Sequence, residues 1–223
     1  MNKGFFITGT DTDVGKTWVS VGVVEQLKQQ GHRVGVMKPI AAGCEQTDAG
    51  LRNEDAQQLR QTSPLKLDYD LVNPYAFAAP IAPHIAAEQT GTKIDTSLLL
   101  QQFNKIQAQS DCVVVEGAGG WKVPLNDTEY LDDLALMLNL PIILVVGMRL
   151  GCLSHALLSA EAIENKGLKL AGWVANVIQP DQSCLLENIQ TLEQHINAPM
   201  LGRVNHHLTL DAKHIAAELS IQL

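Results

Sequence analysis

Paired cysteines, long hydrophobic runs and an excess of basic residues are all absent from this sequence of 223 residues. Its four cysteines are scattered without a C-x-x-C pair, which argues against a zinc site or a disulfide framework and predicts reduced thiols. No apolar run approaches the roughly 18 residues that a membrane helix needs. The opening residues, MNKGFFITGT, lack the long apolar region of a secretory signal. We therefore expect a cytoplasmic protein.

The charge balance is acidic, with a formal net charge of −8. Such a chain offers no basic footprint for nucleic acid or anionic lipid, so neither is expected as a partner. Hydrolase signatures are missing as well, since there is no G-x-S-x-G elbow. The seven histidines include no H-x-x-x-H pair, and His206 and His207 are adjacent, so we expect ordinary surface or hydrogen-bonded roles for all of them. Any anionic ligand must be held by a few well-placed cations and backbone N–H groups.

Short apolar runs alternate with longer amphipathic ones along the whole chain, and five of these runs predict strands. They are residues 5–8, 34–40, 112–117, 142–147 and 170–178. They are apolar throughout, as parallel strands covered on both faces should be. We expect a single α/β domain over residues 1–223, with a doubly wound, mostly parallel sheet and helices on both faces. Residues 69–87 predict an irregular excursion over the ligand face.

The stretch GTDTDVGKT, residues 9–17, resembles a phosphate-binding loop but departs from its spacing. The P-loop is written G-x-x-x-x-G-K-[ST], and here Gly9 lies one position too early. A strand precedes the stretch and a helix follows it, as in a P-loop. We therefore interpret it as a lengthened phosphate loop that brings Asp11 and Thr12 into the site. Lys16 would reach the β- and γ-phosphates and the Thr17 hydroxyl would bind Mg²⁺.

Three further charged residues point to the same edge of the sheet, where ligands bind beyond the carboxyl ends of the strands. Glu116 ends the third apolar run, as a metal-binding acid does in P-loop proteins. Asp55 is a second candidate ligand, although a residue at a helix start can simply favour the helix dipole. Lys38 follows another strand and can either bind an anion or be solvated. The glycines at 117, 119 and 120 would let the backbone approach phosphates closely.

Eight segments in register resemble the dethiobiotin synthetase family. They are FFITGTDTDVGKT, GVMKPIAAG, GLRNEDA, VNPYAF, VVVEGAGGW, PIILVVG, LGCLSHALL and LAGWVAN, and they extend from about Phe5 to Asn176. The resemblance implies a P-loop NTPase fold and a homodimer. It implies the penultimate step of biotin synthesis, in which 7,8-diaminononanoate, CO₂ and MgATP give dethiobiotin, ADP and phosphate through a carbamate and a carbamic-phosphoric anhydride.

The resemblance also assigns roles to individual residues. It implies that Lys38, Lys16 and Thr12 hold the carbamate and the transferring phosphate. It implies that the metal ligands are Thr17, Asp55 and Glu116. The nucleotide contacts that it implies are Asp11, Thr12, Asp13, Val14, Gly15, Lys16, Thr17, Asp55, Glu116, Gly117, Ala118, Gly119, Asn176, Val204 and Asn205. The substrate contacts are Thr12, Lys38, Ala42, Gly119, Gly151, Cys152, Leu153 and Ser154. In the family, the helix that starts at residues 151–154 comes from the other subunit.

Departures from the family pattern keep other interpretations open. Ala42 replaces a frequent hydroxyl residue, Ser154 replaces a common Asn, Asn205 replaces an expected proline, and Asp13 replaces a frequent Glu. An inactive paralogue that retains the nucleotide pocket is therefore one alternative. A P-loop switch ATPase is another, although that class carries an additional lysine near the start of the loop. An amidating synthetase would need a glutaminase domain, for which this chain has no room. The group that takes the amine proton is open between Asp11 and water.

Overall fold

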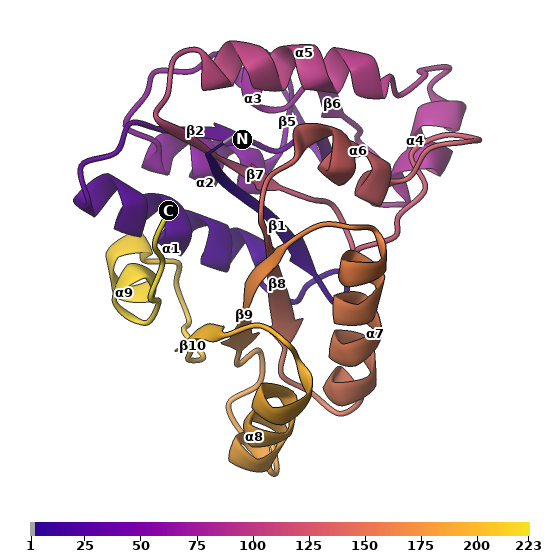
Figure 1. Ribbon diagram of the computed structural model, residues 1–223. Coiled ribbons are helices and arrows are strands. Elements are labelled where there is room, and N and C mark those ends of the chain that lie inside the picture. Colours follow the sequence, from indigo (N-terminus) through magenta and orange to yellow (C-terminus); the bar gives the residue numbers. More distant parts are fainter. Residues whose placement is uncertain (1–2) are drawn as a thin grey trace.

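The central feature of the molecule is a sheet of six parallel strands, as the computed structural model of residues 3–223 shows (Figure 1). Their order is β10-β9-β8-β1-β7-β2, and every neighbouring pair is parallel. The strands are β1 (Gly4–Gly9), β2 (Val34–Met37), β7 (Cys112–Glu116), β8 (Ile142–Gly147), β9 (Leu170–Asn176) and β10 (Met200–Val204). All residues of β1, β2, β7 and β8 are buried, which explains why their sequences are apolar without alternation. The predicted parallel α/β fold is confirmed.

Helices cover both faces of this sheet. They are α1 (Lys16–Gln29), α2 (Glu54–Thr62), α3 (Tyr69–Val72), α4 (Pro83–Gln89), α5 (Thr96–Gln107), α6 (Leu131–Leu138), α7 (Cys152–Asn165), α8 (Leu185–His195) and α9 (Ala212–Ala217). In Figure 1, α1 and α9 lie on one side of the sheet, and α6 and α7 lie on the other. Helix α5 illustrates how the sequence specifies these helices. The Asp95 side chain caps its N-terminus by accepting from Ser97 N, and the apolar residues Leu99, Phe103 and Ile106 are buried along one face.

The second predicted strand is shorter than expected, and this difference shapes the ligand edge. We expected residues 34–40, but β2 ends at Met37 because Pro39 has no N–H for the ladder. Lys38 N donates instead to Val72 O at 2.8 Å. The chain then forms β3 (Ile40–Ala41), which pairs with β6 (Tyr75–Ala76) in a separate small sheet. Lys38 is therefore held at the break between two sheets rather than within a strand.

Residues 69–87 are more regular than predicted. They contain α3, β6 and the start of α4, and Pro83 occupies the first turn of α4, where a missing N–H is tolerated. We did not predict the hairpin of β4 (Glu45–Thr47) and β5 (Gly50–Arg52) or the edge strand β10. Among residues 3–223 there is no helix with both the length and the apolar character needed to cross a bilayer.

Candidate active site

A pocket of about 870 Å³ opens at the carboxyl ends of β1, β7 and β2. These strand ends lie side by side, so the segments that follow them meet at one edge of the sheet. The predicted residues that line the pocket are Thr12, Asp13, Gly15, Lys16, Thr17, Lys38, Ala42, Asp55, Glu116, Ala118 and Gly119. The structure thus brings together all of the lysines, hydroxyls and carboxylates for which we predicted chemical roles, with the exception of Asp11 and Ser154.

The loop after β1 has the backbone of a phosphate cradle. Asp13 and Gly15 both have positive φ, 57° and 84°, and α1 begins directly afterwards at Lys16. Consecutive turns of this kind direct backbone N–H groups into one concavity, next to the N-terminus of a helix. The Lys16 ammonium lies over the loop and donates to Asp11 O at 2.8 Å. The lengthened loop therefore retains a lysine positioned over its centre.

Lys16 is also poorly solvated. Burial, followed by the positive charge of nearby Lys38, lowers the pKa of Lys16 from 10.5 to about 8. A lysine in this state gains more from a phosphate than a solvated lysine does, because the phosphate replaces hydration that the pocket has already removed.

A buried cluster of charges joins the ends of β2 and β7. Lys38 contacts the Glu116 carboxylate at Oε1, and its ammonium lies 3.3 Å from Asp55 Oδ2 and 3.3 Å from Gly117 O. Burial alone would lower the pKa of Lys38, but the carboxylates of Glu116 and Asp55 more than compensate, so its pKa is raised. Lys38 therefore remains charged inside the protein.

Glu116 has one oxygen in use and one without a partner. Oε1 accepts from Thr17 Oγ1 at 2.9 Å and from Lys38, whereas Oε2 is buried with no hydrogen bond from any residue in 3–223. An unpaired buried carboxylate oxygen carries a large desolvation penalty unless a cation or water satisfies it. This oxygen, the Thr17 hydroxyl and the half-exposed Asp55 carboxylate form a hard-oxygen donor set of the kind that Mg²⁺ prefers.

Asp11, within the phosphate loop, and Asn176, beside it, both lie outside the pocket lining. Asp11 forms an ion pair with Arg149, which follows β8. Asn176 ends β9, and its Nδ2 donates to Val14 O at 2.8 Å. A Cβ at Gly15 would lie 1.9 Å from that same nitrogen, so the loop and Asn176 are tightly packed. Asn176 therefore fixes the shape of the loop in this structure.

The remaining predicted contacts lie farther from the pocket. Val14 and Val204 are buried in the core, and Asn205 binds Glu218 through both its backbone N and its side chain. Gly117 follows β7 without being part of the lining. The segment Gly151–Ser154 begins α7 and does not line this pocket either, although Leu153 is partly buried against the core.

Several lining residues were not predicted. They are Trp18, Ile40, Ala41, Asn53 and Val123, together with Gly120, for which we had predicted only a close backbone approach. Asn53 had a detectable signal, because R-N-E-D has an N-cap residue followed by acids. Its side chain accepts from Ala56 N at 3.1 Å and so positions the turn that carries Asp55. Segment 80–83 also lines the pocket, as predicted for the excursion of residues 69–87 over the ligand face, although no individual residue in it was assigned a role.

Comparison with known proteins places the chain among close relatives. Residues 3–214 match a protein-family model described as an AAA domain. The ATP-dependent dethiobiotin synthetase BioD of Pseudomonas aeruginosa (strain UCBPP-PA14) is 49% identical and that of Cellvibrio japonicus (strain Ueda107) is 50% identical. Each alignment covers 98% of this chain and 96% of the relative. The ATP-dependent dethiobiotin synthetase BioD 1 of Escherichia coli (strain K12) is 47% identical over 92% of this chain and 91% of the relative.

Solved structures with low sequence identity share the fold. The MinC:MinD cell division protein complex of Aquifex aeolicus aligns with a TM-score of 0.60 and 13% identity, over 97% of this chain and 86% of that chain. The signal recognition particle receptor FtsY of Elizabethkingia anophelis, in complex with GDP, aligns with a TM-score of 0.51 and 12% identity. The alignment covers 100% of this chain and 61% of that chain. These likenesses concern architecture alone. The near full-length identity of 47–50% decides the family, and the chain belongs to the ATP-dependent dethiobiotin synthetases.

Proposed function

We propose that this protein catalyses the ATP-dependent closure of 7,8-diaminononanoate and CO₂ to dethiobiotin. The observation that supports this most strongly is the cluster of Lys16, Thr17, Lys38 and Glu116 in one pocket, in a chain that aligns end to end with enzymes of that name. The reaction brings an anionic carbamate to an anionic γ-phosphate. Its main obstacle is therefore charge repulsion, which two buried lysines are suited to offset.

In the proposed reaction, one amine nitrogen attacks the carbon of CO₂ and loses a proton, which gives a carbamate. A carbamate oxygen then attacks the γ-phosphorus while the bond to the ADP oxygen breaks. The second amine attacks the carbamoyl carbon, and phosphate leaves as the ring closes and the amine loses its proton. Lys16 would hold the γ-phosphate, while Lys38 and the Thr12 hydroxyl would hold the carbamate oxygens in line with it.

The same pocket would hold Mg²⁺ through the Thr17 hydroxyl and the carboxylates of Asp55 and Glu116. The unpaired Glu116 Oε2 supports this fit. Bound there, the ion would offset the negative charge of the phosphates. Lys38 forms ion pairs with the same two carboxylates, so its charge would be balanced before any substrate binds.

For the nucleotide, the loop from Asp11 to Thr17 and the glycine-rich turn at Gly117–Gly119 would surround the phosphates. We propose that Asn176, Val204 and Asn205 form the adenine end. Asn176 lies against the loop through its bond to Val14 O, which supports a position close to the nucleotide.

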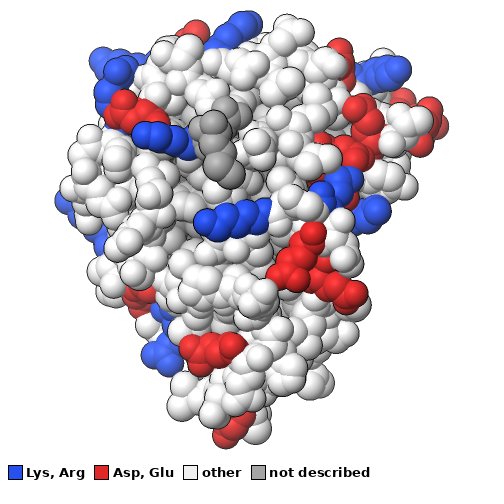
Figure 2. All heavy atoms as spheres, in the orientation of Figure 1, with Lys and Arg blue, Asp and Glu red and all other residues white. Residues whose placement is uncertain are grey.

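The substrate tail is proposed to be bound by a second copy of the chain. The backbone N–H groups of Gly151–Ser154, at the start of α7, would bind its carboxylate. Leu150 and Leu158 project from this region with exposures of 102% and 62%. Figure 2 shows that the surface over the lower half of α7 is almost free of charged side chains. Exposed apolar residues on an uncharged face favour a self-complementary dimer contact.

Two broader features complete the proposal. The chain would fold as one domain, since a single hydrophobic cluster includes residues from β1 to the last residues after α9. A cytoplasmic location would suit its free cysteines, three of which are buried.

Phosphate release from MgATP with bicarbonate, measured with and without the diamine, tests the proposal together with mass analysis of the organic product. We expect release that depends on the diamine and a product enlarged by one carbonyl bridge. Release that is indifferent to the diamine would instead favour a switch ATPase, and no release would favour a nucleotide-binding paralogue.

A further inference from the structure

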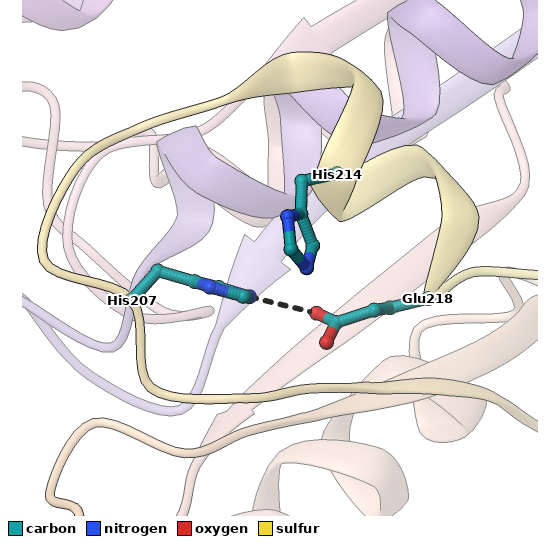
Figure 3. Close-up of side chains that lie close together, drawn as sticks. All are labelled: His207, His214 and Glu218. Atoms are coloured by element: carbon teal, nitrogen blue, oxygen red, sulfur yellow. Dashed lines mark hydrogen bonds and ion pairs between the residues drawn. The ribbon is translucent and has the colours of Figure 1, made fainter.

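A second group of potential metal ligands lies outside the pocket, beside α9. It consists of His207, His214 and Glu218, and one ligand atom of each lies within 4.8 Å of those of the other two (Figure 3). His214 and Glu218 are four residues apart at the end of α9, so they share one face. His207 reaches them from the loop after β10, and its Nε2 lies 3.0 Å from Glu218 Oε2.

The chemistry of the group suits a transition metal rather than Mg²⁺. Two imidazoles and one carboxylate form a donor set that zinc-class ions prefer, usually with water in the fourth position. Zn–N distances of about 2.0–2.1 Å correspond to ligand separations of roughly 3.3 Å in a tetrahedron. The His207–Glu218 pair is already that close. His214 is exposed and neither of its ring nitrogens has a hydrogen bond within residues 3–223, so it can rotate inward.

The surroundings already orient two of the three ligands. Asn205 donates to both oxygens of Glu218, from its backbone N at 3.1 Å and from its side chain. The His207 ring stacks on Trp18, with centroids 6.3 Å apart and an interplanar angle of 12°. Supporting contacts of this kind hold metal ligands in position and lower the entropy lost on binding. The His214 ring lies edge-on to His207, with centroids 4.7 Å apart.

We propose that His207, His214 and Glu218 bind one divalent ion of the zinc class, with water completing its coordination. For His207 and His214 this proposal goes beyond the surface or hydrogen-bonded roles that we expected for all histidines. The site would tie the loop after β10 to α9. It would do so next to Trp18, which lines the pocket two positions after Lys16.

The test uses the full-length protein after treatment with a chelator, without nucleotide and with excess Mg²⁺ to saturate oxygen sites. Co²⁺ serves as a spectroscopic probe, because tetrahedral Co²⁺ absorbs strongly in the visible range. We expect one Co²⁺ per chain, displaced by Zn²⁺. The His214→Ala variant, whose side chain is exposed, should fold normally and bind at least about tenfold more weakly. Glu218→Gln, which retains size and hydrogen-bonding ability, should also bind more weakly.

His206→Ala is the matched control, because His206 is adjacent and exposed but outside the group. It should bind Co²⁺ like the unchanged protein. The proposal is wrong if the unchanged protein shows no tetrahedral Co²⁺ spectrum, or if His214→Ala and His206→Ala bind Co²⁺ equally. None of these measurements involves turnover, so their outcome is independent of the proposed reaction.

Discussion

Lys38 is a charged residue that is enclosed at the ligand edge of the sheet. It is 4% exposed and its ammonium contacts two carboxylates, yet it follows a strand rather than belonging to one. The sequence predicted a lysine at the ligand edge, because a strand end can be located from apolar residues alone. It could not predict whether the lysine would be solvated or enclosed, because the contacts come from residues 17 and 78 positions away.

We expect Lys38→Ala to reduce kcat by about 100-fold or more, because a preorganised cation at developing negative charge is lost. ATP affinity without Mg²⁺ should change much less, since Lys16 and the loop remain. Steady-state kinetics and calorimetric titration with ATP separate the two effects. The control is Lys105→Ala, an exposed lysine on α5. Normal turnover of Lys38→Ala would remove this residue from the mechanism.

Thr17→Val tests the proposed metal position. The substitution keeps the volume but removes the hydroxyl that now donates to Glu116. We expect the Mg²⁺ concentration for half-maximal activity to rise roughly tenfold, as for loss of one oxygen ligand. Thr191→Val, with a helical hydroxyl bonded to Glu187 O far from the pocket, should titrate like the unchanged protein. An unchanged titration for Thr17→Val would contradict the assignment.

At the scale of elements, a lysine with two acidic partners links the end of α7 to the start of α6. Lys166, just after α7, lies 3.1 Å from Asp132 and 2.5 Å from Asp133 in the first turn of α6. The hydrogen bond from Lys166 lowers the pKa of Asp133 below 3.8, and the bond to Asp133 raises the pKa of Lys166 above 10.5.

The pH dependence of this contact follows from those directions. Since the pKa of Asp133 is lower in the folded state, its contribution is complete above pH 3.8 and is lost as the pH falls below that value. We expect Lys166→Gln to reduce the free energy of unfolding by about 1 kcal/mol or less at pH 6. Urea unfolding should show that the difference in free energy of unfolding between the unchanged protein and Lys166→Gln becomes smaller below pH 3.8. Lys169→Gln is the control, as an exposed lysine for which residues 3–223 provide no ion pair. A difference in the free energy of unfolding that is as large at pH 2.5 as at pH 6 would contradict this explanation.

Elements with long apolar runs were predicted well, and short, mostly polar elements were not. Strands β1, β7 and β8 are runs of mostly apolar residues, which a sheet covered on both faces buries completely. The edge strand β10 has a different sequence, MLGRV, and its burial is mostly partial, so nothing in its pattern marks it as a strand. The β4–β5 hairpin consists of exposed or half-buried residues, and only its pairing across Asp48 and Ala49 defines it.

At the scale of the whole molecule, the open question is whether one chain completes its own site. The start of α7 lies outside the pocket lining, although the resemblance implies a role for it in substrate binding. This can be tested by mixing two defective variants, Lys38→Ala and Ser154→Glu. The second places a negative charge where the substrate carboxylate would bind.

If the sites are shared between subunits, each mixed dimer has one intact site. Half of a random mixture is mixed dimer, so about a quarter of full activity should return after subunit exchange. The control mixes Lys105→Ala with Lys38→Ala, which should give only the activity of the former. No recovery on mixing, with exchange verified by native mass spectrometry, would mean that each chain provides its own α7.

The ion pair between Asp11 and Arg149 has a consequence for such a dimer. It joins the nucleotide loop to the segment that begins α7, within one chain. If α7 serves the neighbouring pocket, occupation of one loop alters a segment used by the other, and the two halves of the dimer become cooperative. The pair is partly exposed, so the coupling should be at most about 1 kcal/mol, a few-fold in affinity. The coupling would appear as a Hill coefficient for nucleotide binding that differs slightly from one in the unchanged protein. In Arg149→Gln this coefficient should return to one.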